Sequence, residues 1–223
     1  MQNTAAIEVT DLSFSYGENP VLENVSFTIM QGEFVGIIGS NGAGKSTLLK
    51  LLLGLLDPVS GSISFKEDKS KIGYVEQNAS RKSNFPATAE EIVLSGLWSK
   101  IGFMRFPKKE HREAVQKALE AVEMQDYAKR MMGKMSGGQQ QRIMIARVLV
   151  NSPRVLILDE PTNGIDLKSS EALYELLMHL NKKHGLTIIL VSHDIKRVSK
   201  ITERLLCLNE NSINENPVGE DKA

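Results

Sequence analysis

The 223-residue sequence predicts an α/β fold in which a mostly parallel sheet is covered by helices on both faces. Two observations indicate this class. Apolar runs of strand length recur along the chain, and helical patterns lie between them. Alternation of this kind favours parallel pairing, because each connecting helix returns the chain to the same edge of the sheet. The expected buried strands are 34–38, 72–75, 155–158 and 187–191, and the expected helices between them are 45–55, 108–123, 138–149 and 169–182.

The first 30 residues predict a second, antiparallel sheet. Apolar and polar residues alternate over 7–10, 12–16 and 25–29, which is typical of strands with one buried face. A turn-forming Gly-Glu-Asn-Pro segment at 17–20 separates the second of these runs from the third. We therefore expect three short strands that open the fold as an N-terminal antiparallel β subdomain.

An inserted α-helical subdomain is expected between the second and third buried strands. No apolar run of strand type occurs from 77 to 135, whereas 89–97 and the amphipathic segment 108–123, which follows Pro107, have helical patterns. From 209 the chain becomes polar, as in a poorly ordered tail or an edge segment. The predicted division of this single domain is a core of 1–76 and 140–208, a helical subdomain of 77–139 and a polar tail of 209–223.

Composition excludes several classes of protein. Hydrophobic residues make up 41% and charged residues 24%, which are ordinary values for a globular chain. Lys plus Arg and Asp plus Glu are both 27, so no net field attracts nucleic acid, and no nucleic-acid partner is expected. The longest apolar runs, such as 51–56, fall far short of a membrane span, and no secretory signal is expected. The single cysteine, Cys207, is expected to be a buried, inert thiol in a reducing compartment.

The strongest motif in the sequence is a glycine-rich segment that fits G-x-x-x-x-G-K-[ST], between an expected buried strand and an expected helix. Its glycines let successive backbone N–H groups point at phosphate oxygens, and the helix adds the positive end of its dipole. Lys45 would reach the β and γ phosphates, and the Ser46 hydroxyl would bind Mg²⁺. The expected nucleotide contacts of this phosphate-binding loop are Gly39, Ser40, Asn41, Gly42, Ala43, Gly44, Lys45, Ser46 and Thr47.

A pair of carboxylates follows another expected buried strand, at 155–158. Asp159 fits the Mg²⁺ shell of a phosphate-binding-loop protein, and Glu160 fits a base that orients the attacking water. Together with the loop, the pair predicts a nucleotide hydrolase. A pure binding module is disfavoured, because Glu160 would have no purpose in it.

Other segments resemble the ATPases of the ATP-binding cassette (ABC) family, in that family's order along the chain from 6 to 209. The segment Met135-Ser136-Gly137-Gly138-Gln139 resembles the family signature, although the usual first residue is leucine. Tyr16 resembles the aromatic residue that stacks on adenine, Gln77 the Q-loop glutamine, 163–166 the D-loop and His193 the switch histidine. Glu76 departs from the proline that related chains often have, which leaves the behaviour of the Q-loop open.

The resemblance implies a mechanism with ATP and Mg²⁺ as cofactors. Two subunits would pair head-to-tail as a homodimer, with two ATP molecules between the phosphate-binding loop of one and the signature of the other. Ser136, Gly137 and Gly138 lie at an expected helix N-terminus, which is a second anion site. The implied catalytic residues are Lys45, Gln77, Glu160 and His193, the implied Mg²⁺ ligands are Ser46, Gln77 and Asp159, and the implied further nucleotide contacts are Tyr16, Ser136, Gly137, Gly138 and Gln139.

A narrower resemblance concerns the transported substrate. The segments 84–88, 91–96 and 161–166 are similar to those of bacterial zinc and manganese importer ATPases. This resemblance implies that the chain energises import of a divalent metal, zinc before manganese, through separate integral membrane permease subunits that dock on the helical insert and the Gln77 loop. The chain would lie on the cytoplasmic side of the cell membrane, held there by the permease. An extracellular or periplasmic metal-binding protein would be an indirect partner.

Three other functions stay open on the sequence. An ABC importer for iron chelates or cobalamin would differ from a zinc or manganese importer in its permease. A soluble ABC protein that acts on ribosomes or DNA would have two cassettes, a coiled-coil insertion or a basic patch, and none of these is visible in the sequence. A GTPase or kinase would need a base-reading N-K-x-D or a lid in place of the signature, and residues 181–184 do not match N-K-x-D.

Overall fold

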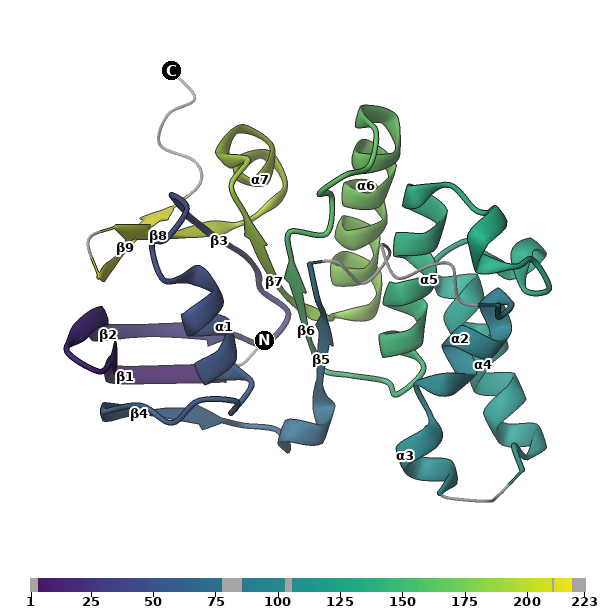
Figure 1. Ribbon diagram of the computed structural model, residues 1–223, viewed down its shortest axis with the longest axis horizontal. Coiled ribbons are helices and arrows are strands. Elements are labelled where there is room, and N and C mark those ends of the chain that lie inside the picture. Colours follow the sequence, from purple (N-terminus) through teal and green to yellow (C-terminus); the bar gives the residue numbers. More distant parts are fainter. Residues whose placement is uncertain (1–3, 78–85, 103–105, 210, 218–223) are drawn as a thin grey trace.

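The computed structural model describes residues 4–77, 86–102, 106–209 and 211–217. A six-stranded sheet runs through the middle of the molecule, with an antiparallel sheet on one side and a group of helices on the other (Figure 1). This arrangement confirms the predicted α/β class with a mostly parallel sheet, an antiparallel β part and an α-helical part. None of the helices within these ranges has the length and apolar character needed to cross a bilayer.

The central sheet has the strand order β5-β6-β7-β3-β8-β9, and every neighbouring pair except β8–β9 is parallel. The four predicted buried strands all lie in it. The polar segment after 209 includes an antiparallel edge strand, as one of its two interpretations predicted, and 218–223 lie outside the described residues. The strands are β3 (Phe34–Gly39), β5 (Ile72–Val75), β6 (Val155–Asp159), β7 (Thr187–Ser192), β8 (Arg204–Asn209) and β9 (Ser212–Pro217).

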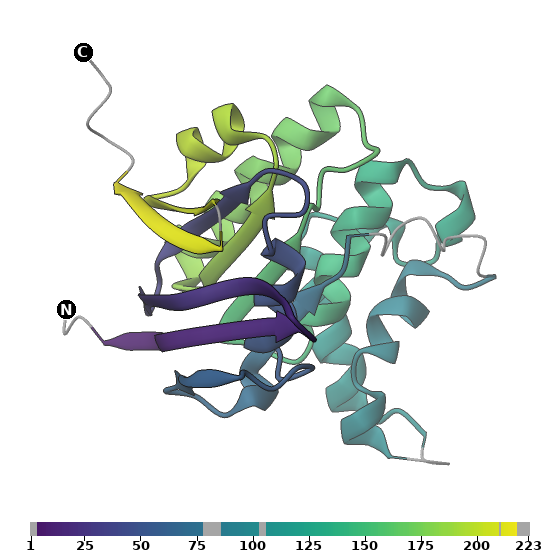
Figure 2. The same ribbon diagram turned by 60° about the vertical axis from the view of Figure 1, so that its left-hand side comes forward.

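The antiparallel sheet differs from its prediction. Its strands are β1 (Ala5–Tyr16), β2 (Asn19–Met30) and β4 (Ser60–Phe65), in the order β2-β1-β4. The expectation of three short strands within the first 30 residues is wrong, because 7–16 form part of a single strand. Asp11 has a positive φ of 48°, and the register with β2 shifts between Val9 and Leu12, so the alternation breaks inside one strand. Figure 2 shows β1 and β2 side by side, with the β8–β9 hairpin next to them.

The predicted helices are all present, with small changes at their ends. The first ends at residue 52 rather than 55, because the chain turns at Gly54, which has a φ of 68°. Three further short 3₁₀ turns lie at Lys69–Lys71, Gln125–Tyr127 and Met132–Lys134. The α-helices are α1 (Lys45–Leu52), α2 (Ala89–Ser95), α3 (Trp98–Ile101), α4 (Lys109–Ala121), α5 (Gly137–Leu149), α6 (Leu167–His184) and α7 (Ile195–Ile201).

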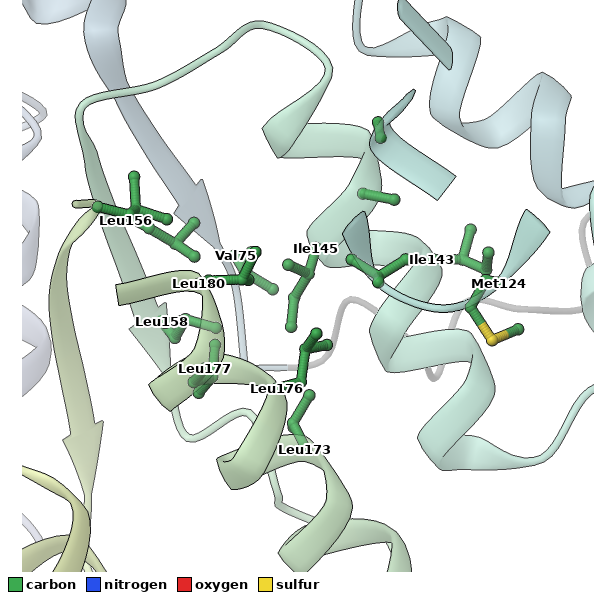
Figure 3. Close-up of a cluster of buried hydrophobic side chains, with 14 of the residues drawn as sticks. Val75, Met124, Ile143, Ile145, Leu156, Leu158, Leu173, Leu176, Leu177 and Leu180 are labelled. Carbon is green, nitrogen blue, oxygen red and sulfur yellow. The ribbon is translucent and has the colours of Figure 1, made fainter. Parts of the chain in front are cut away.

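Burial on both faces explains why the central strands are apolar throughout. Side chains of a strand alternate between faces, so Leu156 and Leu158 of β6 enter the core shared with α5 and α6, whereas Val155 and Ile157 enter the core shared with α1 and the antiparallel sheet. Figure 3 shows Leu158 beside Leu177 of α6 in the first of these cores. With both faces covered, functional side chains can gather only where the strands end.

Candidate active site

The phosphate-binding loop connects β3 to α1, as its motif requires. Gly44, immediately before the helix, has a φ of 95°, and a β-carbon on it would lie 3.1 Å from the Val21 side chain and 3.2 Å from the Val21 carbonyl oxygen. Only glycine fits both the left-handed backbone and this close approach of β2. The loop geometry therefore depends on the antiparallel sheet as well as on its own sequence.

The Lys45 ammonium is held inside the loop. Its Nζ donates to the carbonyl oxygens of Gly39, at 2.7 Å, and Ser40, at 2.8 Å, and the residue is only 8% exposed. Of the two residues that follow, Ser46 is exposed and Thr47 is buried. A fixed positive charge ringed by backbone and placed at a helix N-terminus is suited to bind the phosphates of a nucleotide.

Asp159 ends β6 on the sheet face that α1 covers. Burial raises the pKa of its carboxyl above the usual 3.8, and the charge of Glu160 raises this pKa further, while Lys45 and the Tyr74 hydroxyl lower it. Burial, the charges of Asp159 and Glu76 and the hydrogen bond with Asp159 raise the pKa of Tyr74 to about 12. The Asp159 carboxylate is therefore an electrostatically costly group close to the lysine of the loop.

Glu160 is the centre of a cluster of polar side chains. Its backbone has a positive φ of 44°, unusual for a residue with a side chain, and its N–H donates to the Val191 carbonyl oxygen at 2.9 Å. Oε2 accepts from Gln77 Nε2 at 2.8 Å and from Asn163 Nδ2 at 3.2 Å. Oε1 lies 3.2 Å from His193 Nδ1, and the Glu160 side chain is only 12% exposed. Segments far apart in the sequence thus meet at one carboxylate.

A cleft of about 690 Å³ joins this cluster to the phosphate-binding loop. Six of the predicted site residues line it, and the structure brings them together from β3, the end of β5, β6 and the loop after β7. These predicted residues are Gly39, Ser40, Asn41, Gln77, Glu160 and His193.

Cys207 also lines the cleft, which corrects the expectation of a buried residue. It is only partly buried, because β8 lies beside β3 and Cys207 pairs with Ile38 at the mouth of the loop.

The signature segment lies apart from the cleft of its own chain. Ser136 is the N-cap of α5, where its hydroxyl accepts from Gln139 N–H at 3.3 Å and its own N–H donates to Gln139 Oε1 at 3.1 Å. Gly137 and Gly138 pack against Ile165 and Ser169, at the start of α6. Figure 1 shows β6, β7 and α6 between this end of α5 and α1.

Tyr16 also stands outside the cleft, at the end of β1. The residue is 48% exposed, and its ring packs edge-to-face against Phe14, with ring centroids 4.9 Å apart. An exposed aromatic residue at this position is available for stacking.

Several residues with roles in this geometry were missed or not assigned a role from the sequence. Asn163 was noted only as part of the D-loop, and Tyr74 only as part of a strand. Gln140 is buried and donates to the carbonyl oxygens of Met132 and Met135, which holds the turn before the signature. The contact between Tyr74 and Asp159 depends on the pairing of two strands. The contacts of Asn163 and Gln140 are short-range, but they depend on backbone turns that the sequence does not mark. Of the segments that resemble metal importers, residues 84 and 85 lie outside the described residues.

Comparisons with known proteins identify the family. Residues 22–163 match the ABC transporter family. The zinc uptake system ATP-binding protein ZurA of Listeria innocua is 44% identical over 215 residues, covering 93% of this chain and 84% of ZurA. The manganese transport system ATP-binding protein MntB of Bacillus subtilis is 39% identical over 208 residues, covering 91% of this chain and 83% of MntB.

Solved structures agree with this assignment. CbiO1 of Clostridium perfringens, part of the ABC transporter complex cbiONQ, superposes with a TM-score of 0.87 at 30% identity, covering 96% of this chain and 89% of cbiO1. The dimeric structure of the bacterial ABC transporter cassette MJ0796 gives a TM-score of 0.75 at 32% identity, covering 96% of this chain and 99% of MJ0796. The match in sequence, in fold and in the order of the motifs shows that this chain belongs to the ABC transporter family and is an ATP-binding cassette with ATPase activity.

Proposed function

We propose that the chain is the ATP-hydrolysing subunit of an importer for a divalent transition metal, zinc or manganese. It acts from the cytoplasmic side of the membrane on separate permease subunits, and an external metal-binding protein is an indirect partner. The relatives named as zinc and manganese uptake proteins support the choice of metal. The proposal that ATP hydrolysis drives the import rests on one observation: Gln77, Glu160 and His193 meet in the cleft beside the phosphate-binding loop.

The residues around the loop suit Mg²⁺ and the phosphates of ATP. The exposed Ser46 hydroxyl and the Asp159 carboxylate are hard oxygen donors of the kind that Mg²⁺ prefers, with the Gln77 amide as a further candidate. When bound, Mg²⁺ would neutralise charge on the β and γ phosphates. Backbone N–H groups of 39–47 would cradle the phosphates, and Lys45 and His193 would stabilise charge that develops on the γ-phosphate.

Glu160 is the proposed base. Its carboxylate faces the cleft, is nearly shielded from solvent and is oriented by three polar neighbours. A carboxylate held in one orientation beside the γ-phosphate site can accept the proton of an attacking water. The left-handed backbone of Glu160 turns this side chain out of the sheet and into the cleft.

The functional unit is proposed to be a head-to-tail homodimer with two ATP molecules at the interface. The separation of the signature from the cleft of the same chain supports this arrangement, since Ser136, Gly137, Gly138 and Gln139 would then contact the ATP held by the other subunit. The dimeric relative supports it too. Tyr16 would stack on the adenine of its own subunit.

A groove beside β5 is the proposed docking site of the permease. It has a volume of about 610 Å³, lies between the end of β5 and helices α3 and α5, and is lined by apolar and charged side chains that include Glu76, Lys100, Met144 and Arg147. The same helix α3 carries the exposed Trp98. Because this groove of apolar and charged side chains lies next to Gln77, binding of the permease there would affect the position of Gln77 in the active site.

The test compares Glu160→Gln with Glu175→Gln, a matched change on the exposed face of α6. Without the base, Glu160→Gln should lose hydrolysis by about a hundredfold or more and accumulate as an ATP-loaded dimer, visible by size-exclusion chromatography. Glu175→Gln should behave as wild type. Hydrolysis by Glu160→Gln at the normal rate would contradict the assignment of the base.

The metal is tested in cells that lack the chain and are grown under metal limitation. Elemental analysis should show selective loss of zinc or manganese, restored by wild type and by Glu175→Gln but not by Glu160→Gln. Unchanged metal contents across this panel would overturn the importer while leaving the ATPase in place.

A further inference from the structure

The Glu160 carboxylate receives two amide donors on one oxygen. Gln77 comes from the end of β5, 83 residues away in sequence, whereas Asn163 follows Glu160 by three residues. Both donate to Oε2, whereas Oε1 lies 3.2 Å from His193 Nδ1. A carboxylate oxygen has two lone pairs, so Oε1 can still accept from a water molecule.

The position of Asn163 is fixed by the turn in which it lies. Its backbone N–H donates to the Glu160 carbonyl oxygen at 3.1 Å, which closes a turn over 160–163. The same turn is anchored to α6, since the Thr162 hydroxyl lies 3.1 Å from the Tyr174 hydroxyl. The side chain and the backbone of Asn163 thus both bind Glu160, within one turn of four residues.

We propose that Asn163 is a positioning residue for Glu160: its amide holds Oε2 and so aims Oε1 at the attacking water. The proposal rests on the proposed role of Glu160 as the base. Gln77 donates to the same oxygen from the segment after β5, so its hydrogen bond depends on the position of that segment relative to Glu160. Asn163 supplies the local contact, from within the same turn. Its residue type matters, because a side-chain amide donates a hydrogen bond to a carboxylate whereas an isosteric carboxylate would repel it.

The experiment measures kcat and KM for ATP in Asn163→Ala and in the isosteric Asn163→Asp. Asn214→Ala, on the exposed face of β9, is the matched control. Loss of a hydrogen bond to a charged group predicts a fall in kcat of about tenfold for Asn163→Ala. Asn163→Asp should fall further, by about a hundredfold, because a second carboxylate then faces Glu160. The KM for ATP should stay unchanged in both, and Asn214→Ala should match wild type.

A second readout separates positioning of the base from a contact between subunits. The double variant Asn163→Ala/Glu160→Gln should form the ATP-loaded dimer as readily as Glu160→Gln does, because Asn163 then has no base to position. Failure of that dimer would overturn the proposal in favour of an interface role. Wild-type kcat in Asn163→Ala, or a higher kcat in Asn163→Asp than in Asn163→Ala, would overturn it as well. Normal hydrolysis by Glu160→Gln alone would instead overturn the base itself, so the two failures are distinguishable.

Discussion

Asp159 shows how a single functional side chain can lower stability. Its pKa in the folded protein lies above the unfolded value of 3.8, first because of burial and then because of the Glu160 charge. The native state therefore binds the proton more tightly than the unfolded state. The contribution of Asp159 to the free energy of unfolding thus falls as pH rises from 3.8 through the folded pKa, and the full cost is present above it.

Asp159→Asn is therefore expected to raise the melting temperature at pH 7 by a few degrees in the presence of EDTA, while abolishing Mg²⁺-dependent hydrolysis. The difference from wild type should shrink below about pH 4, where the carboxylate is protonated in both states. Thermal denaturation across a pH series measures this difference in melting temperature. Asp57→Asn, on an exposed loop, is the control. A lower melting temperature for Asp159→Asn at pH 7 would contradict the electrostatic cost.

The sequence predicted the position of candidate site residues where a local motif fixes it. The loop 39–46 and the Asp159–Glu160 pair each follow a strand, so their position at the strand ends follows from the motif itself. Asn163 was not recognised as a partner of Glu160, because the left-handed backbone of Glu160 that brings them together leaves no mark in the sequence.

At the scale of elements, two helices offer a controlled comparison. Both α2 and α5 begin with a capping box, formed by Thr88 with Glu91 and by Ser136 with Gln139. Removing either cap should reduce the free energy of unfolding by about 1 kcal/mol. Ser136→Ala should also lower ATPase activity about tenfold, since the hydroxyl is proposed to contact the ATP held by the other subunit. Thr88→Ala should reduce stability without reducing ATPase activity. Urea denaturation measures the stability and steady-state hydrolysis measures the activity. Equal losses of activity in the two variants would argue against a role for Ser136 beyond capping.

Strands with a clear pattern of apolar residues were predicted from the sequence, whereas strands with a mixed pattern were not. The apolar strands β3, β5, β6 and β7 were found because burial on both faces makes their sequences unambiguous. Strand β4 was missed, because Ser-Gly-Ser at its start has little strand character and its pairing with β1 comes from a tertiary neighbour. Strand β8 was noticed only as an apolar stretch around a cysteine.

At the scale of the whole molecule, one arginine joins the two sheets. Arg204 of β8 donates to Glu33 Oε1 at 2.8 Å, to Glu215 Oε2 at 2.8 Å and to the Thr28 carbonyl oxygen of β2. Arg204→Ala would leave the nearly buried Glu33 carboxylate without its cation, so we expect a loss of about 2 to 4 kcal/mol in the free energy of unfolding. Lys109→Ala, which breaks an exposed pair on α4, should cost less than about 0.5 kcal/mol. Urea denaturation compares the two variants, and equal losses would mean that the contacts of Arg204 add little to the stability of the fold.

Helix α5 has one end at the signature and the other at the groove beside β5. Ser136 caps its first turn, while Met144, Arg147 and Val148 of its second half line the groove. Thirteen residues at about 1.5 Å each make a rod of roughly 20 Å, and an α-helix hardly shortens under a load along its axis. If the permease docks in the groove as proposed, a movement of α5 along its axis there would displace Ser136 by nearly the same distance. Helix α5 would then act as a rigid connection between the permease and the ATP held by the other subunit.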